Sequence, residues 1–290
     1  MLQGVLLYGL VNSAILLLLA LGFNLTFGIS GISNFAYGAI YILAGYLAYI
    51  FANTLGLPYI VGAVLAVLTA AAFGALLYRF VLLRVRGLVL SEVMATFGTG
   101  LIILEMFRYL GFVGFKYTLP VFVEGSVAIG ENYLDFQRMF IVLLAAGLVF
   151  ALWLFTHHTK MGLAFRGIAQ NEETALTLGI DSDQVATWSV AFGAGLAAVA
   201  ALAILPLGTI APEGGYEILM QALAVCIVGG LGSTMGIVLA SILIGFSQTL
   251  TATYLETHWM ILVSLIAILV VLTVSPSGLL GKQKQLEERI

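Results

Sequence analysis

Long apolar runs, separated by short polar islands, dominate the chain from its first residue onward. Residues 1–78 contain no Asp, Glu, Lys, Arg or His. A charged side chain at the centre of a bilayer costs roughly 2.5–3.5 kcal/mol, so uncharged stretches of about 20 residues are typical of membrane-spanning helices. The pattern predicts an all-α, polytopic transmembrane helical bundle. Its hydrophobic segments, about eight by this pattern, lie at residues 4–22, 34–53, 59–78, 92–111, 139–156, 185–205, 217–252 and 259–275.

The run 217–252 is too long for one straight span and is interrupted by glycines between Gly229 and Gly236. It therefore predicts a hairpin of two short helices that turns near the cytoplasmic side or in mid-membrane. Irregular backbone facing lipid is not tolerated at membrane depth, so this turn should be buried in protein or line a wet cavity. Either Ser233 or Thr234 can cap the second helix.

The stretch 28–34 interrupts the first two runs in the same way, with Ser33 or Asn34 as the candidate cap. The two glycine turns indicate a weak internal repeat with broken or re-entrant helices. Such helices point to a transporter's substrate path, because their N-termini present unpaired N–H groups and a positive dipole end. The alternative is that the glycines only permit close packing. The candidate path residues are Asn34, Phe35, Tyr37, Gly38, Gly229, Gly230, Gly232, Ser233 and Thr234.

This candidate path contains no formal charge. We therefore expect weak, transient binding of a zwitterion or a small neutral polar solute, through backbone dipoles and hydroxyl groups instead of a salt bridge.

Basic residues indicate how the spans are oriented. Three short islands hold most of the Lys and Arg, and the positive-inside rule places these islands in the cytoplasm. The segment 112–138 lies one span away, so it is expected to be an external loop. The side of Met1 remains open, because no charge precedes Arg79. The islands contain Arg79, Arg84 and Arg86, then Lys160 and Arg166, and finally Lys282, Lys284 and Arg289.

Composition narrows the class further. Hydrophobic residues make up 62% of the chain and charged residues 9%, and the 33 glycines suit close helix packing, so residues 1–290 are expected to form a single transmembrane domain. The first 22 residues lack the basic region and cleavage site of a signal peptide and are expected to be retained. Cys226 is the one cysteine, which excludes an internal disulfide. The chain has no basic stripe that would bind nucleic acid.

The polar segment 157–184 carries dense helix signals. Asn171 is a good N-cap, Glu172 and Glu173 place negative charge on the first turn, and Gly179 suits the position just past the helix end. These signals predict a helix of about seven residues. Helices shorter than about 12 residues are marginal in water, so this one needs a packing partner, for which its apolar residues are available. They are Ala175, Leu176 and Leu178.

Three motifs resemble the permease family of branched-chain amino acid importers of the ABC type. The run Arg166-x-x-Ala-Gln-Asn-Glu-x-x-Ala-x-x-x-Gly179-Ile180 resembles the family's cytoplasmic coupling segment. The run Asn34-Phe-Ala-Tyr-Gly-Ala39 resembles its Asn-Phe-Ala-His-Gly signature, with Tyr37 in place of the usual His. The run Val228-Gly-Gly-Leu-Gly-Ser-x-x-Gly236 resembles its glycine-rich C-terminal motif. The resemblance covers essentially the whole chain.

The resemblance implies a non-catalytic permease subunit of a prokaryotic inner-membrane importer that works by alternating access. It would pair with a second homologous permease, two ATP-hydrolysing subunits and an external solute-binding protein. The chain has no Walker-type nucleotide-binding run, so no cofactor is expected in it, and ATP and Mg would be used by the partner subunits. The residues expected to couple to the ATPase are Arg166, Gln170, Asn171, Glu172, Glu173, Ala175, Leu176, Leu178, Gly179 and Ile180.

Acidic residues in the predicted external loops form another candidate surface. Glu213, Glu217 and Glu256 could meet basic residues of a solute-binding protein, and ordinary solvation is the equal alternative. Residues 120–130 alternate as in a small external hairpin. Glu105 and Arg108 are spaced to pair on one helix.

Two other polar features are given structural interpretations. Glu92 at a predicted helix start is explained by the helix dipole. His157 and His158 lack the surrounding ligands of a metal site, so no metal is expected.

Other classes were weighed against this interpretation. An ion-coupled secondary transporter would explain broken helices, but it normally places a carboxylate or histidine in the membrane for coupling. An ABC permease for urea or short amides is a second alternative, because related permeases divide among these solutes. An intramembrane enzyme is disfavoured, since no acid pair or nucleophile with a base lies within the apolar runs.

Overall fold

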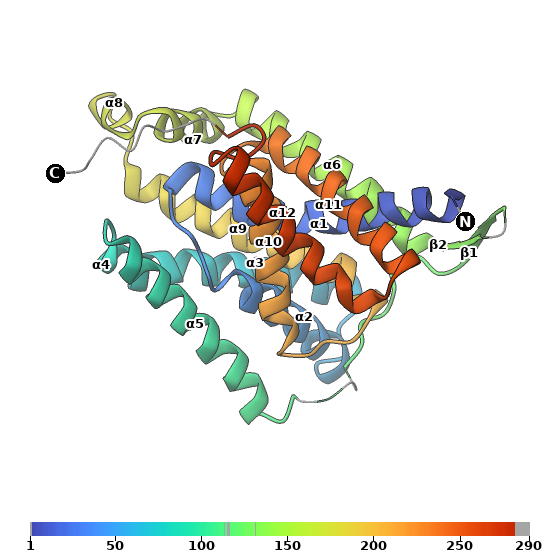
Figure 1. Cartoon of the computed structure of the whole chain (residues 1–290). Helices are drawn as coiled ribbons and strands as arrows, with labels where there is room; N and C mark the ends of the chain where they lie inside the picture. The colour runs from blue at the N-terminus through green and yellow to red at the C-terminus, as the bar shows by residue number, and fades with distance from the viewer. Residues whose placement is uncertain (1, 113, 115–116, 131, 282–290) are drawn as a thin grey trace.

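The computed structural model describes residues 2–112, 114, 117–130 and 132–281, and they form an all-α bundle with one small β-hairpin (Figure 1). The bundle is a polytopic membrane protein. Within the described residues, seven helices are long and apolar enough to cross a membrane, and α10 is a shorter apolar helix.

The helices are α1 (Leu2–Ser30), α2 (Tyr37–Tyr49), α3 (Tyr59–Leu77), α4 (Leu83–Val85), α5 (Val89–Tyr109), α6 (Phe136–His158), α7 (Lys160–Gln170), α8 (Glu172–Thr177), α9 (Ser182–Ile204), α10 (Gly214–Gly229), α11 (Thr234–Tyr254) and α12 (Met260–Val274). Two π-helical turns, η1 (Ile50–Thr54) and η2 (Tyr78–Leu82), continue α2 and α3, and two short 3-10 turns are η3 (Leu205–Leu207) and η4 (Thr257–Trp259). The strands are β1 (Ser126–Ile129) and β2 (Asn132–Asp135).

Helix α1 lies at the centre of the bundle and packs against α9, α10 and α11. Small residues allow this packing, as at Gly22, where an added Cβ would lie 2.5 Å from the carbonyl oxygen of Gly193 on α9. Between membrane helices, close backbone approach replaces the hydrophobic driving force that operates in water. The peripheral helices α5, α6 and α12 instead expose large apolar side chains such as Ile102, Leu143 and Leu269, as expected of a lipid-facing surface.

The two ends of the bundle differ in charge and structure. The basic end, on the left of Figure 1, carries α4, α7 and α8, and an ion pair between Arg86 and Glu172 joins the first two basic islands there. The third island falls on residues 282–290, which lie outside the described part of the chain. The hairpin end carries β1 and β2. Helix α1 begins at this end, because Tyr8 donates from its hydroxyl to the Tyr133 carbonyl at 2.8 Å. This contact decides the side of the first helix, which the sequence left open.

The predicted external hairpin at 120–130 is displaced in the structure. The two strands pair antiparallel over 126–129 and 132–135, with Val127 opposite Leu134. The prediction of strands at 120–130 was therefore wrong in position. Residues 117–125 form no strand and follow an irregular course.

The run 217–252 forms the predicted hairpin of helices, α10 followed by α11. The turn between them lies at the basic end, where Leu279 and Leu280 donate backbone hydrogen bonds to Val228 and Gly229 at 2.9 and 3.1 Å. It therefore joins two passages through the bundle, and α12 crosses once more and returns the chain to this end, where Leu279 and Leu280 lie against the turn.

The first interruption is different, because the chain re-enters the bundle there. Helix α1 continues to Ser30, so Gly28 lies within the helix and the expected break at 28–34 begins only at Gly31. Helix α2 then starts beside the middle of α5, where Gly100 lies against Ala36. The predicted cap is also corrected. Ala36 is the N-cap, and Asn34 closes the preceding turn by accepting from the Ala36 N–H at 3.1 Å.

Candidate functional site

The segment 157–184 forms two helices at the basic end, where the sequence predicted one. Helix α8 starts at the predicted cap, with Asn171 Oδ1 accepting from the Thr174 N–H at 2.9 Å, and it ends before Gly179, whose φ is +82°. Helix α7 was missed. Its signal was Thr159, whose Oγ1 caps the helix by accepting from the Gly162 N–H at 2.9 Å. The two helices meet at Asn171, which ends α7 and caps α8.

Among the described residues, helix α8 packs on the bundle through one face. Ala175 is 2% exposed and belongs to a small cluster with Phe165, Ile168 and the ends of α1 and α9. Leu176 and Leu178 point away from this cluster and are 50% and 76% exposed. The bundle therefore supplies part of the packing that the short helix requires, and a separate apolar surface remains at the basic end.

The other residues expected at this surface are divided between its inner and outer sides. Ile180 packs against Gly167 and the small cluster, and Arg166 is half-buried. Gln170 and Glu173 are exposed beside the two leucines. Only part of the predicted set is thus available to a partner.

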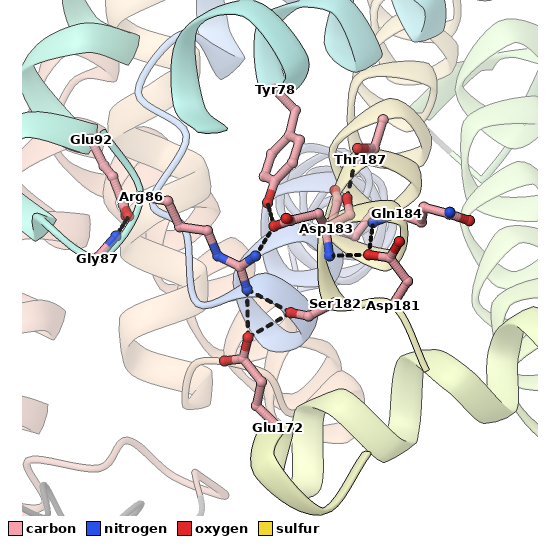
Figure 2. A network of polar contacts seen from close by, with 12 residues as sticks. Tyr78, Arg86, Gly87, Glu92, Glu172, Asp181, Ser182, Asp183, Gln184 and Thr187 are labelled. Atoms are coloured by element: carbon pink, nitrogen blue, oxygen red, sulfur yellow. Dashed lines mark hydrogen bonds and ion pairs between the residues drawn. The ribbon is translucent and has the colours of Figure 1, made fainter. Parts of the chain in front are cut away.

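Arg86, which the sequence marks only as a cytoplasmic charge, makes several contacts at this end of the bundle. It lies in the loop before α5 and reaches both α8 and the start of α9 (Figure 2). Its Nη2 donates to Glu172 Oε1 and to Ser182 Oγ, each at 2.5 Å, and its Nη1 donates to Asp183. Ser182 Oγ also donates to Glu172 at 2.5 Å. One guanidinium therefore joins α8 and the start of α9 to a loop that lies 86 or more residues earlier in the sequence.

Two neighbouring contacts extend this network. Tyr78 donates from its hydroxyl to Asp183 at 3.3 Å, which adds η2, the π-helical turn that continues α3. Glu92 accepts from the Gly87 N–H at 2.8 Å and fixes the loop that carries Arg86 (Figure 2). An exposed ion pair contributes only about 0.2–1 kcal/mol, but a guanidinium with several fixed acceptors has little freedom to reorient. The network thus ties α8 to the start of α9.

The first predicted path motif lies in the re-entrant stretch. Asn34 is buried, and the Phe35 N–H donates to Thr96 Oγ1 of α5 at 3.2 Å, so side chains satisfy the unwound backbone. Tyr37 fills the space between α1 and α9, with its ring edge-to-face on Phe23 at 5.9 Å. Gly38 faces the Gly215 backbone of α10 so closely that no side chain would fit.

The second path motif forms the α10–α11 turn. Ser233 caps α11 as predicted, accepting from the Gly236 N–H at 3.1 Å, and Thr234 is the first residue of the helix. A Cβ on Gly229 would lie 2.6 Å from the Gly236 carbonyl oxygen. Gly232 donates to Asn24 of α1 at 2.8 Å. These contacts favour the close-packing alternative for the glycines, and the two motifs contact the same stretch of α1, at Phe23 and at Asn24.

A cavity of about 610 Å³ opens at the hairpin end between α1, α2, α10 and α11. Its described lining includes residues of neither path motif, but it contains Tyr41 one turn after Tyr37. Arg138 of α6 and Glu217 of α10 both line it. The predicted solute path contains no formal charge, so this charged cavity differs from it.

The three acidic residues expected in external loops have different surroundings. Glu217 lies in the first turn of α10, not in a loop. Glu213 accepts from Arg108 at 2.9 Å, and Arg108 also makes the predicted pair with Glu105 at 2.6 Å. A backbone N–H and Arg108 lower the pKa of the Glu213 carboxyl. Glu256 lies 3.2 Å from His258. No three acidic, His or Cys side chains in the described ranges are placed to hold a metal ion.

Comparisons with known proteins agree with the architecture. A family model described as a branched-chain amino acid transport system permease component matches residues 5–272. The high-affinity branched-chain amino acid transport system permease protein LivH of Escherichia coli is 29% identical over 280 residues, which cover 91% of each chain. BraD of Pseudomonas aeruginosa, a permease protein of the same description, is 27% identical over 289 residues and 94% of each chain. LivM of Escherichia coli is 26% identical over 291 residues, which cover 92% of this chain and 68% of LivM.

Proposed function

Because the chain belongs to the family of branched-chain amino acid transport permeases, we propose that it is the membrane subunit of an ABC importer that carries leucine, isoleucine and valine. Its partners are two ATP-hydrolysing subunits, an external solute-binding protein and a second, homologous permease. It lies in the cell (inner) membrane with the basic end in the cytoplasm. The subunit itself is non-catalytic and holds no cofactor, and ATP and Mg are used by the ATPases.

The coverage of the relatives bears on the kind of second permease. The chain matches LivH and BraD over nearly their whole length, but it covers 68% of LivM. This difference supports a LivH-type position for the chain in a heterodimer, with a longer LivM-type subunit as its partner.

The observation that carries the mechanism is the division of α8 into an anchored face and a free face. Leu176 and Leu178 are exposed at the basic end, where an ATPase would dock, and Ala175 and Glu172 fasten the same helix to the bundle. Movement of α8 by ATPase closure would pass through Arg86 to α9, and through the small cluster to α1. Because α9 packs on both α1 and α3, the displacement reaches the centre of the bundle as a rigid-body motion.

Substitution of the two exposed leucines tests this proposal. Leu176→Asp and Leu178→Asp place charges on the free face without removing a buried contact, so each should reduce co-purification of the ATPase and leucine uptake in proteoliposomes that contain the binding protein. Leu255→Asp is the matched control, because Leu255 is equally exposed but lies after α11 at the hairpin end. Intact ATPase association and transport in both α8 variants would refute the docking role. Competition by urea and acetamide tests the alternative solutes.

A further inference from the structure

The cavity at the hairpin end contains one cationic and one anionic side chain on different helices. Arg138 comes from the first turn of α6, and Glu217 from the first turn of α10. Ionisable residues within membrane helices are costly, and they normally face a water-filled cavity or a substrate pathway. The two residues are separated by 79 positions in the sequence, so only the packing of α6 and α10 around α1 brings them to the same cavity.

The Arg138 guanidinium is held in place from two sides. It stacks over the Tyr8 ring with 5.2 Å between Cζ and the ring centroid, and its Nε lies 3.3 Å from the Asp135 carboxylate. Nε is buried and, among the described residues, it donates no hydrogen bond in acceptable geometry. A planar guanidinium fixed in this way can pair with a carboxylate through two parallel hydrogen bonds.

Glu217 supplies the opposite charge. It lies in the first turn of α10, at the positive end of the helix dipole. Within the described part of the chain it forms no ion pair, in contrast to Glu213 one turn earlier. A carboxylate in this position can accept hydrogen bonds from an ammonium group.

The remainder of the wall is mainly apolar. Aliphatic side chains from four elements contribute to it, including Val11, Ile42, Leu205 and Ile218. The volume of about 610 Å³ falls within the range of small-molecule sites. One cation, one anion and an aliphatic wall are the chemical complement of an amino acid zwitterion with a branched aliphatic side chain.

We propose that this cavity is an acceptance site for the solute on the external side, where Arg138 pairs with the carboxylate and Glu217 with the ammonium group. The site receives the zwitterion after its release from the binding protein and before the helices move. The inference rests on the proposed import function and adds to it a location and a recognition mode within this chain.

Site-directed labelling tests the site directly. Cys226 is buried, so a cysteine introduced at Thr209 on the cavity wall would react selectively with a membrane-impermeant maleimide added from outside. In the assembled transporter in proteoliposomes, millimolar leucine should protect Thr209→Cys from labelling. Isoamylamine lacks the carboxylate and 4-methylpentanoate lacks the ammonium group, so each should protect at about tenfold higher concentration, since a hydrogen bond to a charged group contributes roughly 1.5–3 kcal/mol.

Variants of the two charged residues complete the test. Arg138→Gln and Glu217→Gln should each weaken leucine protection about tenfold. Arg138→Lys should weaken it less, because it keeps the charge but loses the bidentate geometry, and Glu217→Asp should retain most of it. Labelling of Thr209→Cys without leucine verifies that the cavity persists in each variant. Thr257→Cys is the control, because Thr257 is also an exposed threonine at the hairpin end but does not line the cavity. Leucine should leave its labelling unchanged.

The outcomes separate the site from the transport function. Equal protection by leucine and both analogues, or protection that survives both glutamine substitutions, overturns the site even if the wild-type transporter imports leucine. Absence of leucine uptake by the wild-type complex would contradict the proposed function, and the labelling result would still decide whether the cavity binds zwitterions.

Discussion

Arg86 and Glu172 are separated by 86 positions in the sequence, yet a hydrogen bond of 2.5 Å joins them at the basic end of the bundle. The contact makes the loop before α5 a support for α8. The same guanidinium also donates to Ser182 and Asp183. The loop before α5 therefore links α8 to the start of α9, in addition to the covalent connection between these two helices.

Removal of this support should uncouple transport from ATP hydrolysis. Arg86→Gln should lower leucine uptake about fivefold or more per ATP hydrolysed, because typical coupling free energies between distant sites are about 1–3 kcal/mol. The ATPase should still co-purify, since Leu176 and Leu178 are unchanged. Arg84→Gln is the matched control, because Arg84 is exposed in the same basic island and has no ion pair among the described residues. An equal loss in both variants would indicate a general effect of charge.

A double-mutant cycle isolates the pair itself. Arg86→Gln, Glu172→Gln and the double variant should give non-additive losses of uptake, because either single change leaves the other group without its partner. Additive losses would show that the two residues act separately.

A chain of amides and hydroxyls crosses three helices and should stabilise the outer half of the bundle. Asn12 of α1 donates to Gln248 of α11 at 2.9 Å, and Gln248 donates to Ser264 of α12 at 2.8 Å. Gln248→Leu should reduce the free energy of unfolding by about 1 kcal/mol, the range measured for hydrogen bonds between membrane helices. Thermal unfolding in detergent measures it. Ser247→Ala is the control, because Ser247 bonds only within its own helix among the described residues.

The glycine turn should tolerate no side chain. Gly236→Ala would force a Cβ into the Gly229 backbone, which cannot move away as a flexible side chain could. We expect loss of folded protein, measured by size-exclusion chromatography in detergent. Gly147→Ala on α6 has open space around the added methyl group and should behave as wild type. A well-folded Gly236→Ala protein with impaired transport would instead favour the path interpretation of this motif.

Substitutions of Tyr37 test whether the motif that begins at Asn34 packs the bundle or contacts the solute. Its buried hydroxyl has no hydrogen-bond partner among the described residues, so Tyr37→Phe should retain wild-type leucine uptake and stability. Tyr37→Ala should reduce stability by about 3–5 kcal/mol through the cavity left against Phe23. A selective rise in KM for Tyr37→Phe, with unchanged thermal stability, would restore the hydroxyl to the solute path.

The Glu213–Arg108 pair predicts a small dependence of stability on pH. The carboxyl pKa is lowered in the folded protein, so the stabilisation is present above its ordinary value of 4.5 and is lost as the pH falls through the lowered value. Solvent screens this exposed pair, so the effect should be small. Glu213→Gln should slightly reduce the difference in thermal stability between neutral and acidic pH that the wild type shows. Glu105→Gln should retain most of it.

The order of the spans, the hairpin of α10 and α11, and the cap at Asn171 follow from the sequence alone, which also limits the cap of α11 to Ser233 or Thr234. Each depends on the length of an apolar run or on residues within one helical turn, so nearby residues contain the necessary information. The glycine and capping signals at 28–34 predicted the structure less well, because helical backbone hydrogen bonds and tertiary contacts outweigh them there. Helix α1 continues through Gly28 to Ser30, and Thr96 of a distant helix completes the turn around Asn34.

The tertiary structure alone placed Arg86 against Glu172, turned Ala175 inward, and brought Arg138 and Glu217 to one cavity. These relationships join residues on different helices, and neither hydrophobic periodicity nor charge count specifies which faces of two helices meet. The sequence determined which segments cross the membrane because lipid selects on local hydrophobicity. Packing between small residues determined which polar groups those segments bring together.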